Sequence, residues 1–239
     1  MRKVAIVGYT PTKEQAPFEN KDWEIWGMND LYKLIPRYDR WFEFHGKHKE
    51  DFIHKTRPGR TPWPEVKEAL SKMHCPVYLQ EQVPDIPCSV RYPLDEILEE
   101  FGQYFLDPDY AKYFTNTVSF MLALAIYEKF DEIHVYGVDM ATASEYDAQR
   151  PSCEFWLGVA VGRGIKIHIP AQSDLLKTRF MYGYEQEKKD LFEAKVDEML
   201  KNLENKKAHA AQKKRNFEAE EFQYLGALTA LREMKQVWE

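Results

Sequence analysis

The sequence predicts an α/β fold, in which a mostly parallel sheet carries helices on both faces and long helices follow it. Strand-like apolar runs alternate with helical stretches along the first 180 residues, as in a parallel sheet. Residues 117–130, TVSFMLALAIYEKF, are apolar almost all round and read as a buried crossover helix. The composition changes after about residue 181, where Glu, Lys, Ala and Leu dominate.

Six apolar runs are expected to form strands: 3–8, 23–28, 40–45, 76–80, 132–137 and 165–169. The first and the fifth end in a glycine followed by polar residues. Open α/β sheets build a ligand crevice from such strand ends, at their carboxyl edge. We therefore expect residues 1–180 to form a domain that binds a nucleotide or nucleotide-sugar. Residues 181–239 are expected to form a helical extension with two long helices, 184–206 and 212–238.

Composition narrows the functional classes. The chain has 239 residues, 44% of them hydrophobic, and a formal net charge of −6. This charge argues against a protein that coats nucleic acid, although an enzyme with a local basic groove stays open. No apolar run is long enough for a membrane span, and the N-terminus does not read as a secretion signal. Three separated cysteines without a C-x-x-C pair indicate neither disulfides nor zinc, so we expect a cytoplasmic protein.

The first strand runs into the turn GYTPTK, which fits a phosphate. The turn lacks the spacing of a P-loop and of a G-x-G-x-x-G dinucleotide turn. It supplies a glycine for close backbone approach, two hydroxyls and a cation, which are Gly8, Thr10, Thr12 and Lys13. The alternative is an ordinary tight turn with a threonine cap.

Two more polar segments are expected at the same edge. Asn29 follows the second strand, and its side-chain amide can both donate and accept hydrogen bonds with a base or a ribose. Asn116 and Thr117 stand in TNT at the start of the buried helix, where amide and hydroxyl groups favour an anion or a sugar. Helix capping is the alternative for each of them.

Four residues are candidates for the catalytic base. His45 ends the run RWFEFH and shares a strand face with Glu43, although a histidine there can also belong to the core. Asp139, Glu145 and Asp147 follow the fifth strand, together with the cation Arg150. A surface loop is the alternative for this charged segment.

Five short motifs, in order over residues 3–177, carry a family resemblance: GYTPT, GMND, TNTVSFMLALA, VYGVDM and IKIHIPAQSDLL. The chain resembles the sialyltransferases of glycosyltransferase family 42 and related Rossmann-like bacterial and phage proteins. The resemblance implies nucleotide contacts and residues that flank the leaving phosphate, which are Gly8, Thr10, Asn29, Asn116, Thr117, Tyr136 and Gly137. Those enzymes hold a catalytic histidine in a longer lid, and here no histidine precedes His168 in the corresponding interval.

Together these features predict a metal-independent glycosyltransferase with no cofactor beyond its nucleotide-sugar co-substrate. The acceptor would be a glycan or, for a bacteriophage protein working in the host cytoplasm, a modified base of DNA. A protein that binds or sequesters a nucleotide without turnover is the alternative, and a nicotinamide-dependent oxidoreductase is disfavoured by the missing glycines. The C-terminal helices are expected either to form a homo-oligomer or to pack on their own domain.

Overall fold

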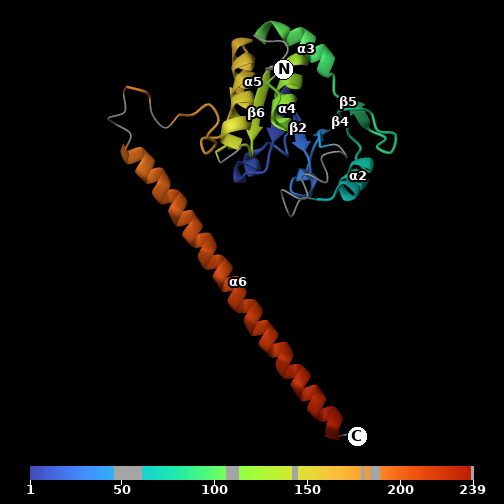
Figure 1. Ribbon diagram of the computed structural model, residues 1–239, viewed down its shortest axis with the longest axis vertical. Coiled ribbons are helices and arrows are strands. Elements are labelled where there is room, and N and C mark those ends of the chain that lie inside the picture. Colours follow the sequence, from blue (N-terminus) through green and yellow to red (C-terminus); the bar gives the residue numbers. More distant parts are fainter. Residues whose placement is uncertain (46–60, 106–112, 142–144, 179–180, 184–188, 238–239) are drawn as a thin grey trace. The chain divides into compact units, whose positions relative to one another are not determined.

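The computed structural model describes residues 1–45, 61–105, 113–141, 145–178, 181–183 and 189–237 (Figure 1). The chain divides into two compact units, Met1–Lys177 and Thr178–Glu239. The first unit holds the sheet and its helices, and the second holds one long helix.

Seven parallel strands form one sheet in the order β5-β4-β3-β2-β1-β6-β7. They are β1 (Lys3–Val7), β2 (Trp23–Met28), β3 (Arg40–Phe42), β4 (Val77–Leu79), β5 (Ser89–Arg91), β6 (Glu132–Tyr136) and β7 (Lys166–His168). The parallel α/β architecture predicted from the sequence is confirmed. The predicted strand set was incomplete, because β5 is a three-residue edge strand with Val90 and Arg91 exposed and shows no apolar run.

Helices cover both faces of the sheet (Figure 1). On one face, α3 (Leu94–Phe101), α4 (Thr117–Tyr127) and α5 (Arg150–Gly162) share a core with alternate residues of the central strands. On the other face lie α2 (Trp63–Ser71) and two 3₁₀ turns, Pro11–Gln15 and Leu31–Lys33. The described elements also include the 3₁₀ turn Gly102–Tyr104 and one π-helical turn, Glu145–Gln149. Because α4 is buried on nearly every side, its uniformly apolar sequence is explained.

The strand order reverses between β1 and β6, and two glycines meet there. Gly8 donates its N–H to the Tyr136 carbonyl at 2.8 Å, and Thr10 donates to the Gly137 carbonyl at 2.9 Å. A Cβ on Gly8 would lie less than 3.0 Å from the Gly137 carbonyl oxygen. Gly137 has φ +68, and a Cβ there would meet the Gly8 carbonyl oxygen at 2.5 Å. The two glycines thus let both chains turn away from the sheet in contact with each other.

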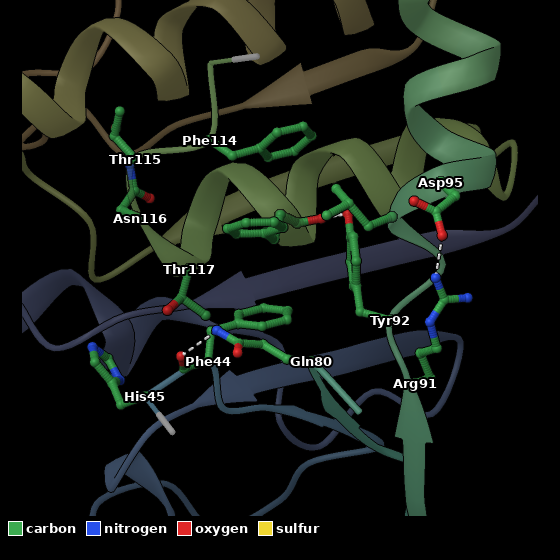
Figure 2. Close-up of a pocket in the computed structure, with 12 residues that line it drawn as sticks. Phe44, His45, Gln80, Arg91, Tyr92, Asp95, Phe114, Thr115, Asn116 and Thr117 are labelled. Carbon is green, nitrogen blue, oxygen red and sulfur yellow. Dashed lines mark hydrogen bonds and ion pairs between the residues drawn. The ribbon is translucent and has the colours of Figure 1, made fainter. Parts of the chain in front are cut away.

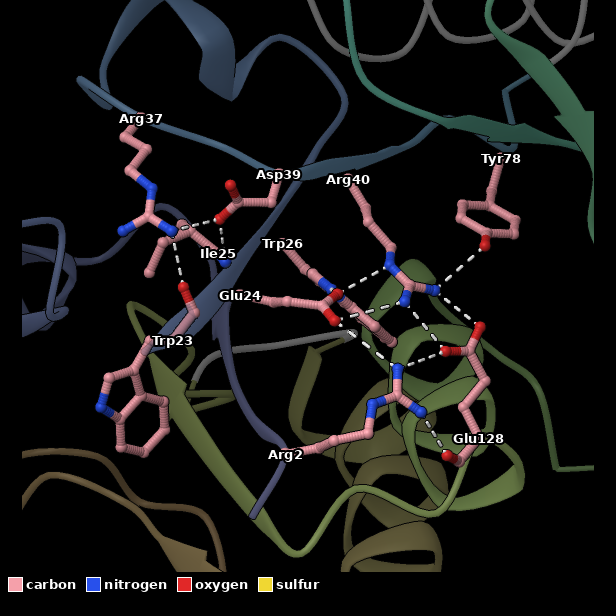
Figure 3. A network of polar contacts seen from close by, with 10 residues as sticks. All are labelled: Arg2, Trp23, Glu24, Ile25, Trp26, Arg37, Asp39, Arg40, Tyr78 and Glu128. Carbon is pink, nitrogen blue, oxygen red and sulfur yellow. Dashed lines mark hydrogen bonds and ion pairs between the residues drawn. The ribbon is translucent and has the colours of Figure 1, made fainter. Parts of the chain in front are cut away.

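A charged network at the opposite, amino edge fixes the far end of α4 (Figure 3). Glu128, the residue after α4, accepts from Arg40 at 2.6 Å and from Arg2 at 3.0 Å. Arg40 also donates to Glu24 of β2 at 2.8 Å and lies 4.8 Å from the Trp26 ring centre. Burial raises the pKa of Glu128, but the hydrogen bonds from the two arginines lower it overall. The network ties α4 to three strand starts, so the helix begins at the carboxyl edge.

The C-terminal extension is a single helix, α6 (Lys189–Val237), so the two-helix prediction was wrong. The polar segment 205–216, which the sequence left open as a turn or an exposed helical segment, is helical, and its four lysines and three alanines favour helix. Within the described residues, no helix combines the length and the apolar character that crossing a bilayer requires.

We expect Gly8→Ala to destabilise the first unit by at least about 2 kcal/mol, because the added methyl group overlaps backbone that cannot move aside. Gly158→Ala is the matched control. Gly158 lies in α5 with open space around its Cβ position, so alanine there should stabilise by roughly 0.5–1 kcal/mol. Urea denaturation of both variants measures the difference. A Gly8→Ala protein as stable as the parent would contradict the close contact.

Candidate functional site

A cavity of about 440 Å³ opens at the carboxyl edge of the sheet (Figure 2). Its walls come from the segments that follow β3, β4 and β5 and from the starts of α3 and α4. The lining residues are Phe44, His45, Gln80, Arg91, Tyr92, Leu94, Asp95, Phe114, Thr115, Asn116, Thr117 and Phe120. A pocket of this size at the carboxyl ends of parallel strands is where open α/β proteins place small ligands.

Aromatic rings form one side of the cavity. Phe120 of α4 lies 4.5 Å from both Phe44 and Phe114, measured between ring centres. Tyr92 meets Phe44 and Phe120 edge-on at 5.3 Å, and its hydroxyl donates to the Phe120 carbonyl at 2.8 Å. These rings are held by one another, so they offer a rigid apolar surface to a planar or sugar-like group.

Polar groups line the rest of the cavity. Arg91 forms an ion pair with Asp95 across the start of α3. Gln80 donates its amide to the Phe44 carbonyl at 3.1 Å, which fixes that side chain over the end of β3. Thr117, in the first turn of α4, is buried, whereas Thr115 is exposed. The helix start adds backbone N–H groups with a partial positive charge, so this wall favours an anionic or hydroxyl-rich ligand.

Glu43 and His45 form a carboxylate–imidazole pair at the cavity wall. The His45 Nδ1 lies 2.8 Å from Glu43 Oε1, and the same oxygen accepts from the His45 backbone N–H at 2.7 Å. The Glu43 side chain is 4% exposed and that of His45 is 33% exposed. A carboxylate that accepts from Nδ1 favours the tautomer with the lone pair on Nε2. The sequence had placed both residues on one strand face, and the structure shows them bonded.

Three buried oxygen atoms at the carboxyl ends of β1 and β2 have no hydrogen-bond partner among the described residues: Thr10 Oγ1, Asn29 Oδ1 and the Tyr32 hydroxyl. Asn29 adopts φ 54, and its backbone is held because its N–H donates to the Phe42 carbonyl at 3.0 Å. An unpaired buried polar atom costs about 1–3 kcal/mol unless water or a ligand satisfies it. Thr10 and Asn29 were both predicted as ligand contacts.

The structure brings three of the four predicted segments into direct contact. The turn after β1 bonds to Gly137 after β6 through Thr10, and to the turn after β2 through Tyr9. The Tyr9 hydroxyl donates to Asp30 Oδ1 at 2.5 Å. The fourth segment, at the start of α4, lies farther along the same edge, on the cavity wall with His45.

Several residues predicted to contact a phosphate instead form hydrogen bonds or ion pairs with other residues of the protein. Thr12 Oγ1 is buried and accepts from the Gly137 N–H at 2.8 Å, and Lys13 pairs with Glu14 at 3.1 Å. Asn116 caps α4 by accepting from the Ser119 N–H at 3.1 Å, while its amide donates to the Gln149 carbonyl at 3.0 Å. These contacts match the capping and turn alternatives set out for the same residues.

Two predicted residues, Tyr136 at the end of β6 and Arg150 after it, contribute less to this edge than the sequence indicated. Tyr136 belongs to the core on the α2 face, where its hydroxyl lies 3.0 Å from His134 Nδ1. Arg150 donates to Glu154 at 2.8 Å and to the Lys177 carbonyl at 2.7 Å.

The remaining candidate acids differ in position. Asp139 follows Gly137 at the end of β6, and Asp147 is exposed in the π-helical turn. Glu145 begins that turn, and its side chain lies outside the described residues.

Sequence reasoning missed three cavity residues: Gln80 directly after β4, Arg91 at the end of β5 and Tyr92 directly after it. Nothing in the sequence marked Arg91 and Tyr92 as residues at a strand end, because β5 itself was not recognised as a strand. Among the residues that the structure describes, no cluster of three or more His, Cys, Asp or Glu side chains is arranged to hold a metal ion.

Comparisons with known proteins show likeness at the level of the fold. No protein-family model matches the chain, and no curated protein sequence does. A structure of the sialyltransferase CstII from Campylobacter jejuni with cytidine-5'-monophosphate has a TM-score of 0.47 and 16% identity, covering 74% of this chain and 82% of that one. The monofunctional α-2,3-sialyltransferase Cst-I from Campylobacter jejuni has a TM-score of 0.46 and 14% identity, covering 72% of this chain and 77% of that one. The sialyltransferase CST-II in complex with a trisaccharide acceptor and CMP has a TM-score of 0.45 and 15% identity, covering 70% of this chain and 80% of that one.

Proposed function

We propose that this chain is a glycosyltransferase that binds a nucleotide-sugar along the carboxyl edge of its sheet. The observation that carries the proposal is the pair of buried oxygens on Thr10 and Asn29. Neither has a hydrogen-bond partner in the described parts of the chain, and both lie beside the point where the strand order reverses. Ligands of open α/β sheets bind at that point, and a ligand would relieve the cost of both oxygens.

The extent of the polar edge favours a ligand of several linked groups. Thr10 follows β1, and the cavity lies at the ends of β3, β4 and β5. Neighbouring strands are about 4.8 Å apart, so β1 and β4 are separated by roughly 14 Å. A nucleotide-sugar has a base, a ribose, a phosphate and a sugar to distribute over this distance. The aromatic wall suits a planar or sugar ring, and the start of α4 suits a phosphate.

His45 is the base that the geometry supports best. In the transfer, the bond between the sugar carbon and the phosphate oxygen breaks, and the nucleotide leaves with the electron pair. The acceptor oxygen forms the new bond to that carbon, and its proton passes to His45 Nε2. Glu43 holds the imidazole in the required tautomer and stabilises the imidazolium that forms. Asp139, Glu145 and Asp147 stay competing candidates.

The proposed transfer uses no metal ion and no cofactor beyond the nucleotide-sugar itself. The acceptor proposed is a hydroxyl-bearing molecule, either a glycan or a hydroxyl group on a modified DNA base. A nucleotide-binding protein without turnover would use the same contacts, so binding and turnover have to be measured separately.

Binding is tested by titrating the protein calorimetrically with CMP, UMP, AMP, GMP and their nucleotide-sugars. Asn29→Gly removes the amide and keeps a residue that accepts φ 54, so the affinity should fall about 5- to 100-fold. The matched control is Asn20→Gly, ahead of β2 at the opposite end of the strand, which should bind normally. Equal affinity in Asn29→Gly and the parent, or no nucleotide binding at millimolar concentration, would defeat the proposal.

Turnover is tested by the release of free nucleotide from the sugar donor that binds best, with candidate acceptors present. His45→Asn should lower the rate by about 10²- to 10⁴-fold and leave donor affinity unchanged. His74→Asn, at an exposed histidine beyond α2, and Asp147→Asn should keep the parental rate. If Asp147→Asn is the inactive variant instead, the base is wrongly assigned. Binding without any turnover would support the non-catalytic alternative.

A further inference from the structure

The long helix α6 carries an apolar stripe that runs from Val196 to Leu231. Its residues recur at intervals of seven: Val196, Leu203, Ala210, Phe217, Tyr224 and Leu231. Leu203, Phe217, Tyr224 and Leu231 are 60–68% exposed. The helix α6, drawn as one continuous ribbon in Figure 1, has 49 residues and therefore extends roughly 70 Å. A seven-residue repeat sustained over this length is the pattern of a coiled coil, in which these residues occupy the d positions.

The a positions, four residues after each d, have a different distribution. They hold leucine near both ends, Leu200 and Leu228, and charged side chains elsewhere, Lys207, Lys214, Glu221 and Lys235. Two parallel copies in register would place each charge directly against its own counterpart across the seam. Like charges in that position are unfavourable and select against that pairing.

An antiparallel pair avoids these contacts. If the two helices cross between residues 215 and 216, an a or d residue i faces the d or a residue 431 minus i of the second copy. Leu200 then meets Leu231, and Leu203 meets Leu228, so leucine pairs form near both ends of the seam. In the middle, Lys214 lies against Phe217, and Lys207 lies against Tyr224, where each lysine stem packs on a ring and its ammonium reaches water. The other charged a residues meet uncharged ones, Lys235 with Val196 and Glu221 with Ala210.

The flanking residues of this same register are complementary. In an antiparallel pair each g residue, one place before an a, faces a g residue whose number makes a sum of 433, and each e residue, one place after a d, faces an e residue whose number makes a sum of 429. Lys213 faces Glu220 of the second copy, and Asp197 faces Arg232. Met199 faces Met234, and both are exposed in the single chain, at 55% and 60%. No like-charge contact arises at the flanking positions, where the remaining pairs are Lys206 with Ala227, Glu204 with Leu225 and Ala211 with Glu218. The register was set only by the a and d residues.

We propose that α6 pairs with α6 of a second copy of this chain as an antiparallel coiled coil centred between residues 215 and 216. The seam would bury the stripe along both helices, and a left-handed supercoil would keep the seven-residue repeat facing the partner. The inference depends on α6 alone and stands apart from the proposed function of the first unit.

The mass of the full chain in solution, measured by light scattering or sedimentation, tests the pairing. Two chains are expected at micromolar concentration. Leu203→Glu should give one chain, because it puts a charge into the apolar end of the seam. Asn202→Glu, one residue away on the outer side of the helix, is the matched control and should stay dimeric. A parent protein with the mass of one chain, or of three, would overturn the proposal.

The orientation is tested by exchanging charges. Lys213→Glu should weaken the dimer about tenfold, since the change makes two symmetric pairs repulsive. The addition of Glu220→Lys should restore the parental dissociation constant, because these two positions face each other only in the antiparallel arrangement. In a parallel dimer, Lys213 would instead face Glu218 of the partner, so the double variant would stay weak. That result would overturn the antiparallel assignment.

Discussion

The close contact between Gly8 and Gly137 is the constraint on which the rest of the first unit depends. It lies where β1 and β6 end side by side and where the strand order reverses. With any side chain at either position, the two backbones would have to separate, and Thr12 could no longer bond to the Gly137 N–H. Because both glycines are small, the chain turns sharply after β1, so that Thr10 bonds to the Gly137 carbonyl and Tyr9 reaches Asp30 after β2.

The two edges of the sheet have separate roles. At the amino edge, Arg40, Arg2 and Glu128 fix the end of α4 by charged hydrogen bonds that are internally satisfied. At the carboxyl edge, buried oxygens of Thr10, Asn29 and Tyr32 have no partner within the part of the chain that the structure describes, and the start of α4 opens onto a cavity. The amino edge is thus closed by its own ion pairs, whereas the carboxyl edge combines internal hydrogen bonds with a few oxygens that a ligand could satisfy.

The sequence predicted the parallel sheet and the polar carboxyl edge because both depend on local patterns, a strand's apolar run and the glycine after it. Thr12 was predicted to bind phosphate, whereas its hydroxyl bonds to Gly137. That partner lies 125 residues away, so the local sequence around Thr12 does not indicate the contact. Arg91 and Tyr92 were missed because a three-residue edge strand shows no periodicity. The break expected in α6 was inferred from polarity, whereas lysine, alanine and glutamine continue a helix readily.

The position of a bound nucleotide tests the central claim most directly, and a crystal structure of the chain grown with a nucleoside monophosphate would give it. The account predicts ligand atoms within hydrogen-bond distance of Thr10 Oγ1 and Asn29 Oδ1, with the rest of the ligand reaching toward the cavity beside His45. A nucleotide bound away from the carboxyl edge, with both oxygens still unpaired, would contradict it.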